Sequence, residues 1–256
     1  MKILHFDQIS STNAWLYDKI SEKNDIADTV VVADYQTAGR GMDKNRWESV
    51  AGKNLLFSIA LNVNFLKAES QFKISQAVSV AIVETLEKII DLDRFYIKWP
   101  NDIYFGDKKL AGMLIQNTVE GRMMGMSVVG IGLNVNQIEF SKDIPNPVSM
   151  KMITGMDYEI ENLLNLLVSN IKTAVDGLRF EGSHDEVDKK YISKLYRYRQ
   201  WADYLYKNKV KSLIINGFDC YGRLILEDQS GEKIVCDVKE LQFFPPSCQP
   251  GSEADV

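Results

Sequence analysis

The sequence has few of the side chains that carry most acid–base and metal chemistry in enzymes. It contains two histidines, His5 and His184, and three cysteines in 256 residues. The cysteines, Cys220, Cys236 and Cys248, are odd in number and lack the close spacing of zinc ligands. We therefore expect no disulfide scaffold, no zinc site and no catalysis centred on histidine.

Long apolar runs and an excess of positive charge are also missing. No apolar stretch approaches the roughly 20 residues that cross a bilayer, and the N-terminal MKILHFDQISSTN lacks the apolar run and cleavage site of a signal peptide. With 30 cationic and 35 acidic side chains, the formal net charge of −5 argues against general adhesion to nucleic acid. We expect a cytoplasmic protein with neither a membrane nor a nucleic-acid partner.

The remaining composition, 45% hydrophobic and 25% charged, is that of a globular protein large enough for one domain or two. Ser11 or Thr12 can N-cap a short helix. Residues 29–36 and 55–63 are predicted strands because they are rich in apolar and β-branched residues. Apolar residues at every fourth position predict a helix over 70–90 with one buried stripe.

The middle of the chain contains further predicted strands and then helices. One strand leads into residues 98–102, and strands starting at 110 and 126 are predicted to form a hairpin around Gly121. A helical period covers 163–180. Ser183 and Glu186 have the S-x-x-E spacing of a capping box that opens another helix.

After Trp201 the pattern changes to short strands separated by Asn-Gly, Tyr-Gly and Ser-Gly turns, which predicts a small β-barrel. We therefore expect an α+β protein, with a mixed sheet and helices over residues 1–200 and the barrel over 201–246. Residues 247–256 have the composition of a disordered tail.

Three polar clusters each have a structural and a functional interpretation. Residues 11–13, Ser-Thr-Asn, either cap a helix or hydrogen-bond a neutral polar ligand. Residues 98–102, Lys-Trp-Pro-Asn-Asp, either form a rigid turn or present Lys98 to a phosphate. Glycines within 109–112 and 130–136 mark either tight packing of strands or close approach of the backbone to a ligand.

A fourth cluster, QTAGRGMDKNRW at 36–47, is a basic loop with two glycines. It matches neither the P-loop nor the G-x-G-x-x-G pattern, so its glycines alone do not indicate a nucleotide. It is either a solvated connection or a binding loop. In a binding loop, the glycines beside Arg40 let the main chain approach a ligand and the guanidinium supplies planar donors.

Taken together and in this order, the clusters resemble the biotin protein ligases, also called holocarboxylase synthetases. The resemblance covers residues 3–244, and its C-terminal part resembles the SH3-like barrel of that family. It implies the class II synthetase-like catalytic fold. The residues that carry it are Ser-Thr-Asn at 11–13, Gln-Thr-Ala-Gly-Arg-Gly at 36–41, Trp47, Lys-Trp-Pro-Asn-Asp at 98–102, Lys-Leu-Ala-Gly at 109–112 and Gly-Ile-Gly-Leu-Asn-Val-Asn at 130–136.

The resemblance implies a two-step ligase reaction. Biotin and ATP give biotinyl-5′-AMP and pyrophosphate, and a lysine of a biotin carboxyl carrier domain then takes the biotin and releases AMP. Such chemistry depends on positioning and electrostatics more than on a protein nucleophile. Mg²⁺ is expected to arrive with ATP. The expected partners are biotin, ATP and the carrier domain of acetyl-CoA carboxylase or a related carboxylase, and the chain is expected to be a monomer or a homodimer.

The resemblance also implies roles for individual residues. Lys98, at the α-phosphate, and Arg40 are the expected catalytic residues. Trp47 is expected beside adenine, where an aromatic face favours stacking, with Lys98, Gly132 and Asn134 also at the nucleotide. The residues expected to contact biotin are Ser11, Thr12, Asn13, Gln36, Gly39, Arg40, Gly41, Met42, Ala111 and Gly112.

Two features depart from the family pattern. Many members have Gly-Arg-Gly-Arg in the loop, and this sequence has Met42 at the second arginine. We expect weaker retention of the adenylate unless Lys44 or Arg46 compensates. Some members carry an N-terminal helix-turn-helix domain; Ser11 lies too near the start of this sequence for one, so no repressor activity is expected.

Two other functions stay open. Lipoate– or octanoate–protein ligases share the catalytic architecture and a related Lys-Trp-Pro-Asn-Asp motif, although the Gly-Arg-Gly loop and the barrel favour biotin. A non-catalytic biotin-binding regulator would share the pocket, although an intact Lys98 favours turnover.

Overall fold

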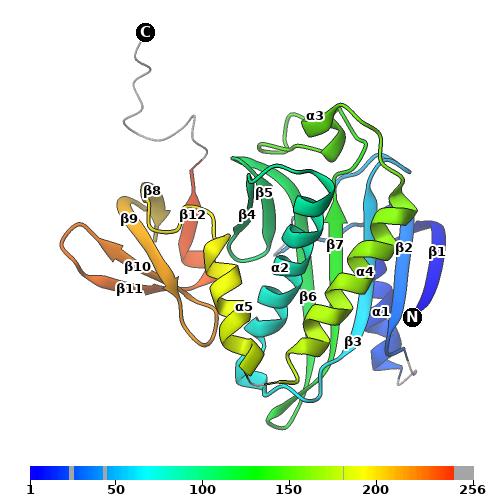
Figure 1. The fold of residues 1–256 in the computed structure, drawn as a ribbon, viewed down its shortest axis with the longest axis horizontal. Coiled ribbons are helices and arrows are strands. Elements are labelled where there is room, and N and C mark those ends of the chain that lie inside the picture. The colour runs from blue at the N-terminus through cyan, green and yellow to red at the C-terminus, as the bar shows by residue number, and fades with distance from the viewer. Residues whose placement is uncertain (23–25, 43–44, 181, 245–256) are drawn as a thin grey trace.

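The computed structural model describes residues 1–22, 26–42, 45–180 and 182–244. It contains a seven-stranded mixed sheet with helices on both faces and, beside it, a five-stranded antiparallel sheet (Figure 1). The predicted α+β class is confirmed. The predicted tail, 247–256, lies outside the described residues. Within these ranges, no helix has the length and apolar character needed to cross a membrane.

The large sheet has the strand order β1-β2-β3-β7-β6-β5-β4. β1 runs parallel to β2, and the remaining neighbours pair antiparallel. Its strands are β1 (Lys2–Ile9), β2 (Thr29–Gln36), β3 (Leu55–Asn62), β4 (Phe95–Lys98), β5 (Asp102–Phe105), β6 (Lys108–Glu120) and β7 (Met123–Leu133).

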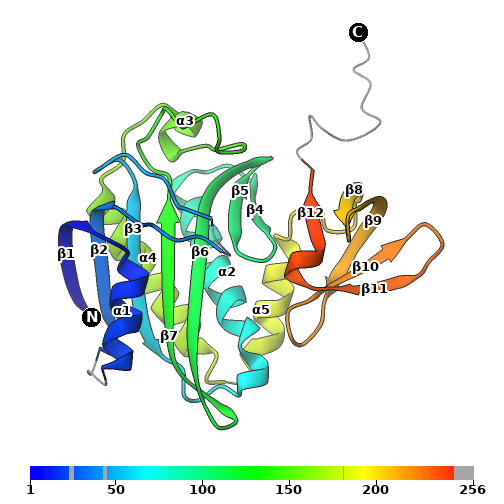
Figure 2. The same cartoon turned by 180° about the vertical axis from the view of Figure 1, so that it is seen from behind.

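The helices divide between the two faces of this sheet. α1 lies on one face and α2 and α4 on the other, with α5 beside α2 (Figures 1 and 2). They are α1 (Thr12–Ser21), α2 (Phe72–Ile89), α3 (Met150–Thr154), α4 (Ile160–Gly177) and α5 (Gly182–Ser193). Short 3-10 turns cover Ala68–Ser70 and Val238–Glu240.

β3 shows how strand alternation separates the two faces. Phe57 and Ile59 point into the main core with α2 and α4, whereas Ala60 packs in the smaller cluster under α1. Ser58, between them, also faces α1 and bonds to it. Because successive strand residues point to opposite faces, Ser58 and Ala60 lie on the α1 face of this central strand and Phe57 and Ile59 on the other.

The second sheet contains every described strand after Ser193, in the order β11-β10-β9-β8-β12. The aromatic rings of Phe72, Tyr191 and Phe218 pack edge-on against one another where this sheet meets α2 and α5. The strands are β8 (Trp201–Tyr206), β9 (Lys209–Phe218), β10 (Leu224–Asp228), β11 (Lys233–Cys236) and β12 (Leu241–Phe243).

A buried hydrogen bond also joins the two sheets. Trp99, 3% exposed, donates from Nε1 to the carbonyl of Gly222 at 2.7 Å. We expect Trp99→Phe to lower the free energy of unfolding by about 1–3 kcal/mol, because it leaves a buried carbonyl without its donor. Urea unfolding measures this change. An unchanged midpoint would show that water replaces the indole and that this bond does not hold the sheets together.

Most predicted elements are present, with exceptions at their ends. The β6–β7 hairpin is confirmed, and Gly121 has the positive φ of +65° that the turn requires. The capping box is wrong: Ser183 lies inside α5 and its hydroxyl donates to the carbonyls of Gly177 and Phe180. β1 was not predicted, because an edge strand that is half exposed lacks a clear apolar period.

Candidate active site

A cavity opens on the α1 face of the large sheet, between the start of α1, the strands β3, β6 and β7, and the loop after β2. In Figure 2 this loop crosses in front of the sheet. Ten of the predicted residues line the cavity: Ser11, Thr12, Asn13, Gln36, Arg40, Gly41, Met42, Trp47, Gly112 and Gly132. The fold therefore brings the N-terminal, loop and glycine clusters together, although they are far apart in the sequence.

The closed end of the cavity is a buried chain of hydrogen bonds. Gln36 Oε1 accepts from the backbone N–H of Thr12 at 2.8 Å and from the Thr12 hydroxyl at 3.2 Å. The Thr12 hydroxyl also contacts the Ser58 hydroxyl at 2.8 Å. Ser11 is both a helix cap, accepting from the Ala14 N–H at 3.3 Å, and a residue of the cavity wall. The structural and the functional interpretation of this cluster are thus compatible.

Asn13 adds an acceptor to this end. Its Nδ2 donates to the carbonyl of Leu114 at 3.1 Å. Its Oδ1 is buried and has no hydrogen-bond partner in the described part of the chain. A Cβ at Gly130 would lie 2.8 Å from Asn13 Nδ2, so glycine is needed for the asparagine to fit. A buried acceptor without a donor costs roughly 1–3 kcal/mol, which a ligand N–H would remove.

Trp47 lies on the two strand glycines. A Cβ at Gly132 would lie 2.4 Å from its ring, and one at Gly112 would lie 3.0 Å from it. The bond from the Trp47 N–H to the Gly39 carbonyl, 3.1 Å, folds the loop back over the sheet. Trp47 Nε1 is buried, with no partner among the residues that the structure covers.

A second cavity begins on the other side of this ring. It shares Trp47, Arg46 and Lys109 with the first cavity and extends to Asn134 and Pro145. Lys109 Nζ lies 5.7 Å from the centre of the Trp47 ring. The two cavities therefore adjoin and share the Trp47 ring, Arg46 and Lys109, and the second also has the acidic residues Glu48 and Asp143 in its wall.

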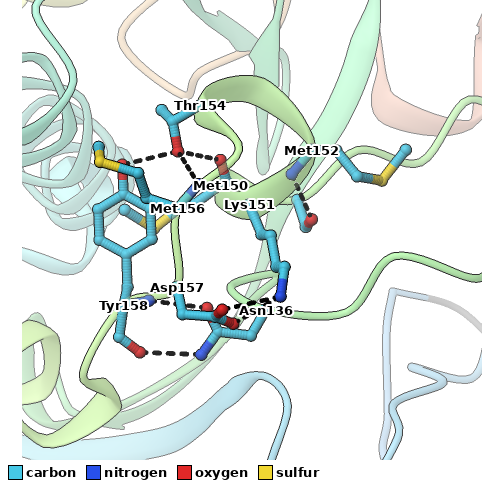
Figure 3. A network of polar contacts seen from close by, with 9 residues as sticks. Asn136, Met150, Lys151, Met152, Thr154, Met156, Asp157 and Tyr158 are labelled. Carbon is cyan, nitrogen blue, oxygen red and sulfur yellow. Dashed lines mark hydrogen bonds and ion pairs between the residues drawn. The ribbon is translucent and has the colours of Figure 1, made fainter.

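The chain that follows β7 supports the second cavity. Asn134 donates from Nδ2 to the carbonyl of Val148 at 3.0 Å. Asn136 holds Tyr158 by two bonds, accepting from its N–H at 2.9 Å and donating to its carbonyl at 2.8 Å (Figure 3). Lys151 and Asp157 form an ion pair in the same network. The asparagines of the Gly-Ile-Gly-Leu-Asn-Val-Asn motif therefore fix the loop that forms the cavity wall.

Lys98 lies apart from both cavities. It lines a third, smaller one, where its Nζ donates to the Tyr104 hydroxyl at 3.0 Å. The same Nζ lies 5.0 Å from the centre of the Phe243 ring, which belongs to β12 of the second sheet. The C-terminal sheet thus covers the lysine that we expected at the α-phosphate.

Burial lowers the pKa of Lys98 from its ordinary value, because the charged ammonium is removed from water. The carboxylate of Asp102 opposes this shift, and the cations of Lys109 and Arg197 add to it. Asp102 lines the first cavity and pairs with Lys109 at 2.7 Å. Lys98 is therefore within electrostatic range of the first cavity while its ammonium points elsewhere.

The sequence also matches a known protein family. Residues 5–134 match the model of the biotin/lipoate A/B protein ligase family, and this span covers half of the chain and both cavities' strands. The chain belongs to this family.

Individual relatives extend the match. The bifunctional ligase/repressor BirA of Salmonella typhimurium is 29% identical to this chain, and the match covers 86% of this chain and 67% of BirA. The chloroplastic biotin–protein ligase 1 of Arabidopsis thaliana is 35% identical over 86% of this chain and 54% of its own. The chain spans about half the length of most curated relatives that it matches.

Solved structures agree in fold. The structure of biotin protein ligase from Aquifex aeolicus in complex with biotin and ATP superposes with a TM-score of 0.76. It is 27% identical, and the match covers 94% of this family member and 97% of the other chain, so it includes the C-terminal sheet.

Sequence reasoning missed two features of this family member's site. Ser58 is the one polar residue inside the predicted strand 55–63 before Asn62, and that interruption was the available signal. The second feature is the ion pair between Asp102 and Lys109. Both residues belong to predicted motifs, but no role was predicted for either. Ala111 is buried in the main core and is not among the residues that line the cavity, because it points opposite to Gly112.

The described residues contain no group of three or more histidine, cysteine, aspartate and glutamate side chains that could hold a metal. Lys44, one of the two residues expected to compensate for Met42, lies outside the described residues. Arg46, the other, lines both cavities, and its side chain is exposed.

Proposed function

We propose that this chain activates biotin with ATP and transfers it to a carrier protein. A carboxylate oxygen of biotin attacks the α-phosphorus, and the bond to the β-phosphate oxygen breaks, giving biotinyl-5′-AMP and pyrophosphate. A lysine ε-amine of a carrier domain then attacks the acyl carbon, forms an amide, loses a proton and releases AMP. The membership in a biotin/lipoate ligase family supports a ligase of this kind.

The observation that carries biotin as the substrate is the unpaired acceptor Asn13 Oδ1 at the closed end of the first cavity. The ureido ring of biotin has two N–H donors and one carbonyl, and it needs partners of both kinds. Thr12, Gln36 and Ser58 lie beside Asn13 in the same wall. A dithiolane has no N–H group and would leave Asn13 unpaired, so lipoate is the weaker candidate.

The second cavity suits ATP. Trp47 offers an aromatic face to adenine, and Arg46 and Lys109 line the cavity beside it. The exposed Arg40, in the loop, is free to reach the carboxylate–phosphate junction. Mg²⁺ arrives with ATP in this proposal and neutralises the leaving pyrophosphate.

Lys98 reaches the α-phosphate in this proposal only by leaving the Tyr104 hydroxyl. The lowered pKa favours this movement, because a phosphate restores to the ammonium the stabilisation that burial removes. The described parts of the loop, residues 37–42 and 45–47, lie over the adenylate in this proposal and keep water from the anhydride. A regulator without turnover needs neither this lysine nor the second cavity.

The remaining assignments are part of the same proposal. Residues 1–200 form the catalytic domain and 201–246 an SH3-like barrel, which covers Lys98 through Phe243. The carrier domain belongs to acetyl-CoA carboxylase or a related carboxylase. The chain acts as a monomer or homodimer, in the cytoplasm where ATP and the carboxylases occur.

The test is incubation of the protein with ATP, Mg²⁺ and an apo carrier domain, with either biotin or lipoate, followed by mass spectrometry of the carrier. We expect the mass of biotin to be added to one lysine, with AMP and pyrophosphate as products. Addition of lipoate alone would overturn the assignment of biotin. Biotin binding without formation of AMP would support the regulator instead.

Met42 tests the proposed fate of the intermediate. We expect Met42→Arg to slow dissociation of biotinyl-5′-AMP by about 5- to 10-fold, because a guanidinium in the cavity wall gains a charged hydrogen bond to the adenylate. Stopped-flow chase of preformed adenylate measures this rate. Met156→Arg adds the same charge at an exposed position outside the cavity and is the control. Equal rates in wild type and Met42→Arg would contradict the role of this position.

A further inference from the structure

The third cavity, which Lys98 lines, has walls from both sheets and a volume of about 100 Å³. Lys98 Nζ donates to the Tyr104 hydroxyl at 3.0 Å and lies 5.0 Å from the centre of the Phe243 ring, within the range of a cation–π contact. Asp102, the carboxylate that raises the pKa of Lys98, forms its ion pair with Lys109. The contacts that hold this ammonium are thus a neutral hydroxyl and an aromatic face.

The third cavity adjoins the second one, since Pro145 lines both. The chain around Pro145 is fixed by Lys109, whose N–H donates to the Asn146 carbonyl at 2.7 Å and whose carbonyl accepts from the Val148 N–H at 3.0 Å. The backbone of Lys98 is fixed as well, because β4 pairs with β5. Movement of the ammonium toward the second cavity therefore needs a change in the side-chain rotamers of Lys98 and no change in the backbone.

Phe243 is held in place by the second sheet. It ends β12, whose backbone pairs with β8. Its ring packs edge-on against that of Tyr204, with 5.2 Å between the ring centres. Because the backbone pairing and this ring contact both belong to the second sheet, the position of that sheet decides whether an aromatic face lies beside Lys98.

We propose that Phe243 is a positioning residue that, together with the Tyr104 hydroxyl, retains Lys98 away from the second cavity and restrains formation of the adenylate until ATP draws the lysine out. This inference rests on the proposed function and deepens it, since it gives the second sheet a restraining role. The phosphates of ATP offer the ammonium charged acceptors, which a hydroxyl and an aromatic ring are not. If the lysine is released in only a fraction of the molecules, ATP binds more weakly in proportion to that fraction.

The test is steady-state kinetics of biotin-dependent pyrophosphate exchange in the full chain, with ATP varied. Phe243→Leu removes the aromatic face and keeps an apolar side chain. We expect its KM for ATP to fall about 3- to 10-fold, the strength of a desolvated cation–π contact, while kcat stays within about twofold of the wild type. Tyr104→Phe removes the hydroxyl and keeps the ring, and we expect a fall of similar size. This second variant tests the proposal if Phe243→Leu unfolds the protein.

Three matched variants separate retention of Lys98 from a general loosening of the second sheet. Phe243→Tyr keeps the aromatic face and is expected to have the wild-type KM for ATP. Phe218→Leu makes the same change where this sheet packs against α2 and α5, outside the third cavity, and is also expected to have the wild-type KM. Phe243→Leu added to Lys98→Ala is expected to leave the KM of Lys98→Ala unchanged, because the retained lysine is gone.

The outcomes distinguish this inference from the function on which it rests. A higher KM for ATP in Phe243→Leu would show that the ring helps to bind the nucleotide and would overturn the inference, as would an unchanged KM in both Phe243→Leu and Tyr104→Phe. A fall of equal size in Phe218→Leu, or in the Lys98→Ala background, would assign the effect to the sheet and would likewise overturn it. Absence of biotin-dependent exchange in the wild type would instead overturn the proposed function.

Discussion

Lys98→Ala is expected to lower biotin-dependent exchange of pyrophosphate into ATP by about 100- to 1,000-fold, the usual effect of removing one donor from a developing charge. Biotin binding is expected to change little, because Lys98 does not line the cavity proposed to hold the ureido end. The measurement combines exchange kinetics with calorimetry for biotin. Exchange near the wild-type rate would contradict the role of Lys98 at the α-phosphate.

The stability of a second variant shows that this loss is not unfolding. Burial lowers the pKa of Lys98 in the folded protein below its unfolded value. The charged lysine therefore costs stability at all pH values below the folded pKa, and the cost disappears as the pH rises through the folded to the unfolded value. At pH 7 we expect Lys98→Met to have a higher melting temperature than the wild type, by about 2–4 °C for each kcal/mol of desolvation cost that it removes. We expect it to lose pyrophosphate exchange as Lys98→Ala does.

Lys190→Ala is the control for the removal of a lysine. Lys190 lies on α5 and pairs with Glu84 and Glu186 on the helical side of the molecule. Its replacement is expected to leave exchange unchanged and to affect stability by no more than about 1 kcal/mol, the range of exposed ion pairs.

Gly132→Ala is expected to lower kcat/KM for ATP by about 10- to 100-fold. The new Cβ would lie 2.4 Å from Cε2 of Trp47 and 2.8 Å from two further ring atoms. The ring cannot keep its place on the sheet, and the nucleotide loses the aromatic face, which contributes roughly 1–3 kcal/mol to stacking on a base. Steady-state kinetics with ATP as the varied substrate measure the effect, and tryptophan fluorescence reports the displaced ring.

Gly177→Ala is the matched control, because a Cβ there has no atom within 4 Å in the described residues and the backbone does not have a positive φ. It is expected to have wild-type kinetics. Unchanged kinetics for ATP in Gly132→Ala, together with an altered fluorescence spectrum, would show that Trp47 moves without consequence and that the nucleotide binds elsewhere.

Elements with a strong local pattern were predictable from the sequence. The apolar stripe of residues 70–90 is α2, and the turn at Gly121 is the hairpin between β6 and β7, because periodicity and a positive φ are properties of the local chain. The helix predicted over 163–180 is α4, Ile160–Gly177, shifted by three residues. Ends of helices depend on which groups are free to cap them, as the failed capping box at Ser183 shows.

Within the candidate site, the sequence determined which clusters to examine, and only the tertiary structure decided which atoms meet. Strand alternation separates Gly112 from Ala111, and the pairing of β7 between β3 and β6 brings Ser58 and Gly130 to Asn13. The alternation is a local property of the strand, but which face meets the cavity and which strands lie side by side follow from long-range pairing.

Lys98 shows the same division most clearly. Its motif identified the residue, and the family match supports the ligase chemistry assigned to it. The direction of its ammonium depends on Tyr104 and on Phe243, which is 145 positions away in the chain and reaches Lys98 through β12 of the second sheet. The sequence by itself thus determined the family and the residue types of the site. The docking of two sheets, driven by burial of aromatic and apolar surface, decided where the lysine points.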